Sequence, residues 1–195
     1  MLRITAGEFR GRRLKVPKVE ATRPLVERAR EGLFNLLREQ LEDAVVWDVY
    51  AGSGILGLEA LSRGASQVLA VEMNRDAVRQ IEENVALMGL EERHRCLRTD
   101  AFRLPKMRGL GPTPDLVFFD PPYDDFRKGG ERREKVWELF VALAGKTSPG
   151  GCAVVHTPRG ILQEGEMSRL PGLQRRDYSN TSLYWCHAPT TGNAS

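Results

Sequence analysis

Short apolar runs alternate along this chain with longer segments in which apolar residues recur every three to four positions. The short runs predict strands at residues 45–50, 67–72, 94–98, 115–119, 152–156, 173–178 and 182–187. The longer segments predict helices at residues 24–41, 55–63, 74–88 and 131–144, the third of them capped by Asn74. Strands and helices that alternate this regularly predict an α/β fold, a doubly wound parallel sheet with helices on both faces. The last two strands lie close enough in sequence to add an antiparallel hairpin at one edge.

The remaining segments complete the predicted organisation. Residues 2–16 alternate around Gly7 and Gly11 and predict a basic β-hairpin or a pair of short strands, and residues 17–21 predict a linker. The stretch after the third strand, up to Met107, predicts a short helix or a loop, and the polar residues 124–130 predict a mobile loop. The predicted divisions are an N-terminal hairpin extension at 1–20, a main domain at 21–188 and a flexible tail at 189–195.

The composition is that of an ordinary globular protein. The chain has 195 residues, of which 41% are hydrophobic and 28% charged, which suits one domain with its own core. No apolar run approaches 18 residues, and arginines occupy the N-terminus where a signal peptide needs an apolar segment, so we expect a cytoplasmic protein without a membrane span. The cysteines, odd in number and far apart, predict neither disulfides nor a zinc site; they are Cys96, Cys152 and Cys186. The histidines lack ligand spacing, so no metal is expected and structural roles are predicted for His94, His156 and His187.

Positive charge is concentrated at the start of the chain. Residues 1–38 carry ten Lys or Arg and four acidic residues, a net charge of +6 in a chain whose total is +3. This asymmetry favours binding of a polyanion, although a solvated basic face would have the same composition. The side chains predicted to contact RNA are Phe9, Arg10, Arg12, Arg13 and Lys15. The basic ones would meet phosphates, and the phenylalanine either stacks on a base or packs the hairpin onto the domain.

Unusual residues follow four successive predicted strands. In strand order they are Ala51-Gly52-Ser53-Gly54, Glu72, Thr99-Asp100 and Asp120-Pro121-Pro122-Tyr123. Ligands of parallel α/β sheets bind beyond the carboxyl ends of the strands. Glycines and acids at four such ends are difficult to attribute to turns alone, so we predict a ligand site there.

Two cofactor classes fit the first of these ends. A GxGxxG pattern begins at Gly52, and Glu72 stands 20 residues later, where dinucleotide-binding folds place a ribose-binding acid. An NAD-dependent oxidoreductase is therefore a serious alternative. Against it, Asp48 stands four residues before the first glycine, a feature that resembles the first motif of S-adenosylmethionine-dependent methyltransferases. Asp100 supplies an acceptor for an adenine amino group, and no acid–base set for hydride transfer follows.

The fourth strand ends in an acid, two prolines and a tyrosine. Pro121 and Pro122 lack a backbone N–H and have a fixed φ, so the chain leaves the sheet in a stiff, extended form. This presents the Asp120 carboxylate and nearby carbonyls as acceptors beside the Tyr123 ring, an arrangement that suits a flat group with an amino function. A tight turn after a core strand would use the same residues. The motif resembles the Asp-Pro-Pro-Tyr motif of methyltransferases that act on exocyclic amines of nucleobases.

Several further segments occur in the same order as in one known family. They lie within residues 3–11, 22–24, 28–35, 48–65 (DVYAGSGILGLEALSRGA), 71–74, 99–100 and 119–123. Together they resemble the RsmD family, the 16S ribosomal RNA guanine-N2 methyltransferases, over nearly the whole chain up to the terminal strands. The chain departs from the family pattern at Leu25, Ile55 and Asn74, where a threonine, a small residue and an aspartate are common. Some members have phenylalanine in place of Tyr123. None of these differences removes a group that the chemistry needs.

The resemblance implies a Rossmann-like class I methyltransferase with a seven-stranded sheet in the order 3-2-1-4-5-7-6 and S-adenosylmethionine as cofactor. It implies methylation of a guanine N2 in 16S ribosomal RNA, in the small ribosomal subunit or an assembly intermediate, and we expect a monomer. The implied catalytic residues are Asp120, Pro121 and Tyr123. The implied cofactor-binding residues are Asp48, Tyr50, Ala51, Gly52, Ser53, Gly54, Glu72, Met73, Asp100, Ala101, Phe102 and Asp120. An adenine-N6 or cytosine-N4 methyltransferase, an NAD-dependent oxidoreductase and a non-enzymatic RNA-binding module remain alternatives.

Each cofactor contact has an expected role. Glu72 would bind both ribose hydroxyls, and Asp100 would accept a hydrogen bond from the adenine amino group. Met73 and Phe102 would flank the adenine ring, although Phe102 suits the core equally well. Asp48 would hold the glycine loop, or the amino group of the cofactor indirectly or through water.

Overall fold

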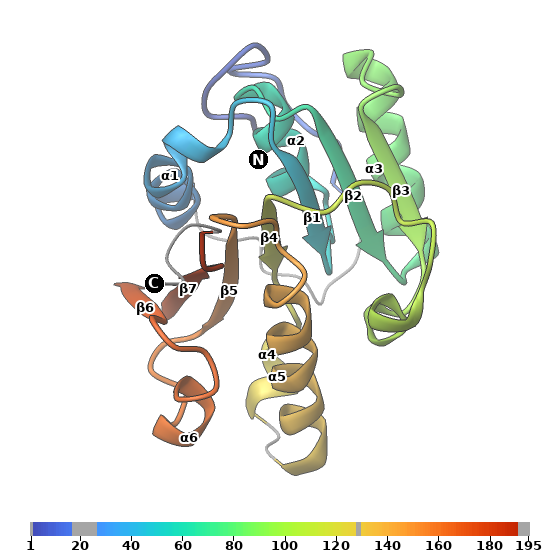
Figure 1. Cartoon of the computed structure of the whole chain (residues 1–195). Helices are drawn as coiled ribbons and strands as arrows, with labels where there is room; N and C mark the ends of the chain where they lie inside the picture. The colour runs from blue at the N-terminus through green and yellow to red at the C-terminus, as the bar shows by residue number, and fades with distance from the viewer. Residues whose placement is uncertain (1, 17–26, 128–129, 191–195) are drawn as a thin grey trace.

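The computed structural model describes residues 2–16, 27–127 and 130–190, and within them the chain forms one mixed sheet with helices on both faces (Figure 1). Its strands are β1 (Val45–Val49), β2 (Gln67–Glu72), β3 (His94–Arg98), β4 (Leu116–Phe119), β5 (Cys152–Pro158), β6 (Gln174–Tyr178) and β7 (Thr181–His187). Their order is β3-β2-β1-β4-β5-β7-β6, and β7 runs antiparallel to both of its neighbours. The predicted order, and the hairpin at the edge, are confirmed.

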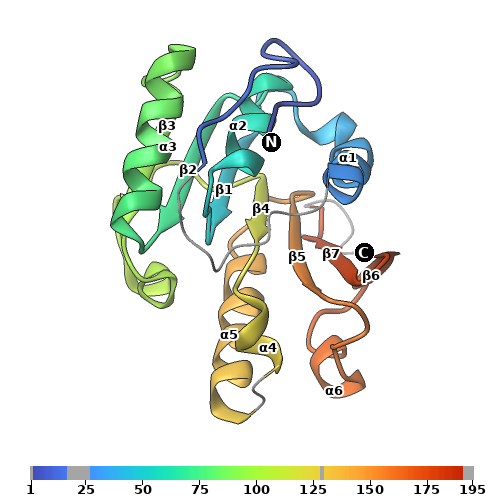
Figure 2. The same ribbon diagram turned by 180° about the vertical axis from the view of Figure 1, so that it is seen from behind.

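The helices divide between the two faces of the sheet. They are α1 (Glu27–Leu36), α2 (Ile55–Ser62), α3 (Arg75–Met88), α4 (Tyr123–Arg127), α5 (Gly130–Ala144) and α6 (Glu164–Met167), with 3₁₀ helices η1 (Arg38–Gln40) and η2 (Ala101–Lys106). One apolar core lies between the sheet and α1, α2 and α3; the other lies under α4, α5 and η2 (Figure 2). Strand β1 supplies both cores, because successive side chains such as Val46 and Trp47 point to opposite faces.

The N-terminal hairpin packs on the same face as α2. Its two arms meet through hydrogen bonds from the Ile4 amide to the Arg12 carbonyl and from the Leu14 amide to the Leu2 carbonyl, 3.0 Å each. Ile4 and Leu14 are buried in the core beneath. At the turn, Gly7 has φ +81° and lies so close to the end of α2 that a Cβ would stand 1.7 Å from the Ser62 carbonyl oxygen. This hairpin therefore requires glycine at its point of contact.

A buried ionic cluster fastens the hairpin to the domain. Glu59 of α2 is fully buried and forms ion pairs with Arg30 of α1 (3.5 Å) and Arg63 (2.9 Å). Its carboxylate also accepts from the Thr5 amide (3.0 Å) and the Thr5 hydroxyl. The Arg30 guanidinium donates in turn to the Arg3 carbonyl (3.0 Å). One carboxylate thus links two helices and the hairpin.

Some sequence predictions are wrong or fall outside the described residues. Of the segment 124–130, predicted as a mobile loop, residues 124–127 lie in α4 and Gly130 begins α5, while 128–129 lie outside the described residues. Its polar composition concealed the fully buried Phe126, and Asp124 and Asp125 in the first turn favour a helix N-terminus. The predicted linker and the start of the predicted helix 24–41 lie in residues 17–26, outside the described part, and the rest of that helix gives way to η1 after α1.

Helix α6 was not predicted, and the division into 1–20, 21–188 and 189–195 stays a prediction. No helix among the described residues has both the length and the apolar character that crossing a bilayer requires.

Candidate active site at the carboxyl edge of the sheet

The end of β1 places a buried acid under the first turn of α2. Asp48 is 1% exposed, and its Oδ2 accepts from the Gly57 amide at 2.9 Å. Burial raises the pKa of Asp48 to about 8, against the lowering effect of that hydrogen bond, and the charges of Asp120 and Glu72 raise it further. Oδ1 is buried with no hydrogen-bond partner among the described residues. Asp48 therefore holds the first turn of α2, the helix that follows the glycine loop, and its predicted contact with the cofactor stays a prediction.

The chain then turns sharply through residues in the left-handed region, of which Tyr50 is strained. Tyr50 has φ 63°, an uncommon value for a residue with a side chain, and Gly54 has φ 73° at the N-cap of α2. A Cβ on Gly54 would stand 2.9 Å from Ile81 Cγ1. The Tyr50 ring packs edge-on against Phe119, and its hydroxyl is buried without a described partner; this burial raises the pKa of Tyr50. Such strain at a strand end is typical of binding sites.

Glu72, at the end of β2, joins two loops of the site. Its Oε2 accepts from the Gly52 amide (2.9 Å) and its Oε1 from the Asn74 amide (2.8 Å). Asn74 caps α3, as predicted, through bonds from the Asp76 and Ala77 amides to its side chain. Met73 follows Glu72 with 68% of its surface exposed, unusual for a large apolar side chain. The Glu72 carboxylate therefore lies next to an exposed apolar side chain, that of Met73.

The end of β3 carries the predicted adenine-side residues. Asp100 caps η2 by accepting from the Phe102 amide (3.1 Å), Ala101 is buried, and Phe102 is half-buried. Arg132 of α5 lies over the Phe102 ring, 4.7 Å from its centroid, and binds Asp125 of α4 through two hydrogen bonds of 3.1 and 3.0 Å. The bond to Asp125 raises the pKa of Arg132. Sequence reasoning missed this arginine, which holds Phe102 against the second core.

The end of β4 presents Asp120 at the surface of the site. Its side chain is 24% exposed, and Oδ1 lies 2.7 Å from Nδ1 of His156, the residue at the matching position of β5. Pro121 is buried, and the Pro122 carbonyl accepts from the Asp125 amide, which starts α4. Asp120 therefore faces outward with one oxygen bonded.

Tyr123 is anchored by its hydroxyl. The Tyr123 hydroxyl lies 2.8 Å from His156 Nε2 and donates to Thr181 Oγ1 of β7 at 2.9 Å. The half-buried ring lies 5.3 Å from the His156 ring, centroid to centroid, and the Arg127 guanidinium is 5.6 Å from the tyrosine ring centroid. The prediction that His156 is only structural missed its contact with Asp120. The signal was available, because His156 ends the predicted strand 152–156, as the other candidates end theirs.

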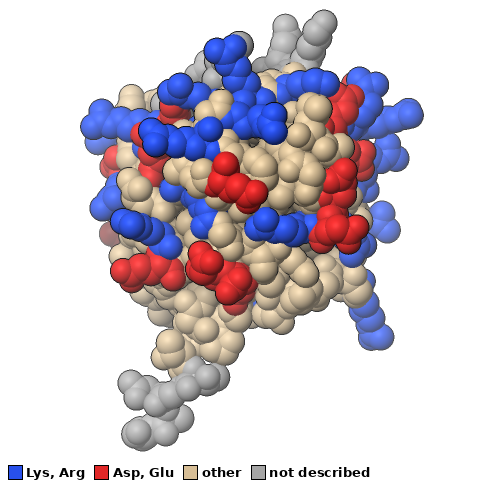
Figure 3. Space-filling model, turned by 90° about the horizontal axis from the view of Figure 1, so that it is seen from above, with Lys and Arg blue, Asp and Glu red and all other residues tan. Residues whose placement is uncertain are grey.

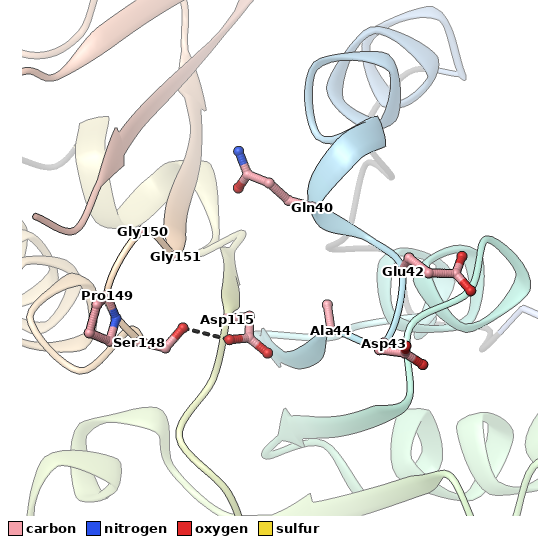
Figure 4. A pocket seen from close by; sticks show the side chains of 9 residues that line it. All are labelled: Gln40, Glu42, Asp43, Ala44, Asp115, Ser148, Pro149, Gly150 and Gly151. Atoms are coloured by element: carbon pink, nitrogen blue, oxygen red, sulfur yellow. Dashed lines mark hydrogen bonds between the residues drawn. The ribbon is translucent and has the colours of Figure 1, made fainter. Parts of the chain in front are cut away.

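One small space among the described residues touches this part of the site. It measures about 10 Å³, enough for at most one water molecule, and lies against Asp120 and His156. The larger cavity, about 330 Å³, lies at the opposite edge of the sheet (Figure 4). There Asp115 is occupied by the Val45 amide (2.9 Å) and the Ser148 hydroxyl (2.5 Å), so its role is to join strand ends.

The predicted RNA-contact residues lie toward that opposite edge. The tip of the hairpin is bound to the end of α2, with the Phe9 amide donating to the Ser62 hydroxyl (3.0 Å). Phe9 is half-buried against the first core, whereas Arg10, Arg12, Arg13 and Lys15 are exposed. Viewed from that side, Lys and Arg side chains gather over the upper part and both sides of the face, with Asp and Glu between them (Figure 3). The hairpin tip therefore lies at the end of α2, away from the strand-end acids.

The strand order, the antiparallel β7 and the row of acids at the carboxyl ends define the Rossmann-like class I methyltransferase fold. Residues 2–184 match the family described as Conserved hypothetical protein 95. The chain belongs to this family, which is the RsmD family that its motifs resemble.

Relatives and solved structures agree with this assignment. Over 129 residues the chain is 41% identical to Ribosomal RNA small subunit methyltransferase D of Escherichia coli K12, and the alignment covers 66% of this chain and 62% of that protein. The alignment thus spans less than two thirds of that relative. The solved structure of yhhF from Escherichia coli superposes with a TM-score of 0.76 and 28% identity over 97% of this chain and 99% of that one. The solved structure of a hypothetical protein of Thermus thermophilus gives a TM-score of 0.76 and 31% identity over 97% of this chain and 100% of that one.

Proposed function

We propose that this protein transfers a methyl group from S-adenosylmethionine to the exocyclic N2 of a guanine in 16S ribosomal RNA. The observation that carries the proposal is the partly exposed carboxylate of Asp120 at the end of β4. It is supported by a relative that is named a ribosomal RNA small subunit methyltransferase. Such an enzyme would act in the cytoplasm, as a monomer, on the small subunit or an assembly intermediate.

The site suits the hydrogen-bonding character of S-adenosylmethionine. Ribose hydroxyls, the adenine amino group, the α-amino group and the sulfonium are donors or cations, and the strand ends offer carboxylates. Glu72 accepts one backbone bond at each oxygen and keeps lone pairs for two hydroxyls. Asp100 uses Oδ1 for the Phe102 amide. The unpartnered Oδ1 of Asp48 and the Tyr50 hydroxyl lie beside the same loop.

The same contacts disfavour NAD. Rossmann dehydrogenases bind a pyrophosphate with free amides of the glycine-rich loop at a helix N-terminus. Here the Gly52 amide already donates to the Glu72 carboxylate. A pyrophosphate would have to displace that bond and lie near the carboxylates of Glu72 and Asp120, which repel its charge.

The chemistry needs positioning more than acid–base catalysis. When bound, the cofactor supplies a methyl group on a positively charged sulfur, which leaves as a neutral thioether. Asp120 and the Pro121 carbonyl would accept the two N–H bonds of the guanine amine and aim its nitrogen at that methyl. Orientation of this kind contributes up to roughly 7–11 kcal/mol. The new N–C bond leaves one surplus proton on nitrogen, which Asp120 can accept.

Tyr123 would fix the plane of the base as a wall of the site. Its ring is held by the bonds from its hydroxyl to His156 and Thr181, so it does not need the substrate to order it. The exposed arginines of the hairpin would bind phosphates of the RNA away from the target base, with an affinity that falls as the salt concentration rises. The target base must also leave its stack, at a cost of about a few kcal/mol.

The test is methylation followed by nucleoside analysis. Ribosomal RNA and small subunits from cells that lack the enzyme are incubated with the protein and labelled S-adenosylmethionine, and the nucleosides are separated by mass spectrometry. N2-methylguanosine is expected, and it should disappear with Asp120→Ala. N6-methyladenosine or N4-methylcytidine would favour the alternative amines. A thermal shift with NAD but none with S-adenosylhomocysteine would overturn the cofactor assignment.

A further inference from the structure

Asp120, His156, Tyr123 and Thr181 form one chain of hydrogen bonds from the open edge of the site into the sheet. Asp120 Oδ1 is 2.7 Å from His156 Nδ1, and His156 Nε2 is 2.8 Å from the Tyr123 hydroxyl. The tyrosine hydroxyl lies 2.9 Å from Thr181 Oγ1, which lies 2.7 Å from the Thr157 carbonyl. Because the chain of bonds ends on a carbonyl, the direction of every bond in it is determined.

The directions follow from which groups can donate. A carbonyl only accepts, so Thr181 donates its proton to the Thr157 oxygen. Thr181 Oγ1 must then accept the proton of Tyr123, and the Tyr123 oxygen must accept from Nε2–H of His156. A neutral imidazole with a proton on Nε2 has none on Nδ1. The 2.7 Å contact with Asp120 therefore holds one more proton, on the carboxyl or on Nδ1.

The relative basicity of the two partners leaves that proton on the imidazole. The residues that line the small space beside Asp120 and His156 are apolar and offer the proton no other site: Leu33, Leu56, Phe118, Phe119, Val154 and Leu183. Among the described residues, Asp120 and Tyr123 are the titratable groups bonded to the ring. An imidazole is intrinsically a stronger base than a carboxylate. Tyr123 is committed as an acceptor from Nε2, so it cannot take the proton.

We propose that His156 is a positioning residue, an imidazolium that keeps Asp120 ionised and fixes its orientation. This rests on the proposed function and specifies how its acceptor is prepared. The carboxylate is bonded to His156 through Oδ1. Its Oδ2, to which no described residue donates a hydrogen bond, is then presented to the target amine. A protonated Asp120 would offer the amine only the weaker acceptor of a neutral carboxyl group, and it could not take up the surplus proton of the reaction. An imidazolium at His156 prevents that form, and Tyr123 and Thr181 hold the imidazolium in place.

The first test observes the imidazole directly and does not depend on enzymatic activity. The chain has three histidines, so ¹⁵N-histidine resonances can be assigned with the variants His94→Gln, His156→Asn and His187→Asn. We expect long-range ¹H–¹⁵N spectra at pH 7 to show both His156 nitrogens protonated, and only Nε2 protonated in Asp120→Asn. A neutral His156 in the unchanged protein would overturn the proposal.

The second test separates positioning from general structural support. His156→Ala should lower kcat by up to about 10²-fold, as for a misplaced group, with the KM for the cofactor within about twofold. His156→Asn should recover most of kcat, because its amide nitrogen lies near the position of Nδ1 and donates to Asp120. His187→Asn, exposed at the other end of β7, is the matched control.

Unchanged kcat in His156→Ala, or equal losses in the alanine and asparagine variants, would contradict the inference. If the protein methylates no RNA at all, the proposed function fails, and the nuclear magnetic resonance result alone decides the state of His156.

Discussion

Two carboxylates of this protein, Glu59 and Asp120, organise clusters of similar size but opposite design. Glu59 is fully buried between α1, α2 and the hairpin, and both of its oxygens are bonded, by the Thr5 amide and the Arg63 guanidinium among others. Asp120 is partly exposed, and the one described hydrogen bond of its carboxylate runs from Oδ1 to His156. A saturated carboxylate joins parts of the fold, whereas one with a free oxygen at a strand end is prepared for a ligand.

The partners of the two carboxylates differ in the same way. Glu59 faces arginines, which stay charged at any accessible pH, so the charge of its partners does not change with pH. Asp120 faces a histidine, the side chain that gains and loses protons near neutrality. Removing the first acid should therefore damage the fold, and removing the second should damage the chemistry.

The largest effect is expected for Glu59→Gln. The change leaves Arg30, 1% exposed, without its counter-charge, and breaking a buried ion pair in this way costs about 3–5 kcal/mol. Urea denaturation should show this loss in the free energy of unfolding. Glu83→Gln, which removes exposed pairs with Lys15 and Arg79, is the control and should cost less than about 1 kcal/mol. Equal costs would remove the distinction between the two kinds of acid.

Asp120→Asn should give the reverse outcome. The loss of one positioned polar group at a reacting centre lowers rates by about 10²- to 10³-fold. Because the side chain is partly exposed and bears little of the packing, the free energy of unfolding should change by less than about 1 kcal/mol. Both are measured on one preparation, by methyl incorporation and by urea denaturation. A variant that loses several kcal/mol of stability, roughly as expected for Glu59→Gln, but keeps its specific activity would place Asp120 with Glu59.

A third acid, Asp48, tests whether burial or bonding sets these roles. Its folded pKa of about 8 lies above the usual value of an unfolded aspartate, so the unfolded state releases its proton first as pH rises. Stability should then fall with pH between about 4 and 8, by up to about 1.4 kcal/mol per unit. Asp48→Asn should flatten this slope in denaturation series across that range. An unchanged slope would show that Asp48 is ionised in the fold.

The smallest effect is expected at the hairpin. Replacing one exposed arginine that meets a phosphate, as in Arg12→Gln, should reduce the salt dependence of RNA affinity by about 0.7 in the log–log slope. Filter binding across a salt series measures it. Arg169→Gln, on the segment after α6 and paired with Glu134, is the control and should leave the slope as it is. If both variants behave alike, the hairpin is not the RNA contact.

Features that depend on local pattern were predictable from the sequence. The strands, their order and the acids at their ends follow from apolar runs, family motifs and the rule for parallel sheets. The cap at Asn74 also came from its position before a helical pattern. These predictions needed no knowledge of which residues face each other across the fold.

Features that depend on register were not predictable. The contact of His156 with Asp120 depends on how β5 pairs with β4. Val155 lies opposite Phe119, so the residues that follow them, His156 and Asp120, lie side by side. Likewise, Arg132 reaches Phe102 only because α5 packs on η2. The helical turn after the prolines was missed because one buried side chain, Phe126, stands among polar neighbours.

The position of the hairpin tip sets a minimum size for any RNA that is to touch both regions. The tip is bound to the last turn of α2, which returns to the edge where β1 begins, and β1 alone spans roughly 17 Å. With a rise of about 3.4 Å per stacked nucleotide, that gap corresponds to about five nucleotides of one strand. Under the proposed hairpin contact, a lone nucleoside or a trinucleotide would reach the acids without reaching the arginine at the tip. Activity should then rise abruptly once a fragment is long enough to bridge the two ends.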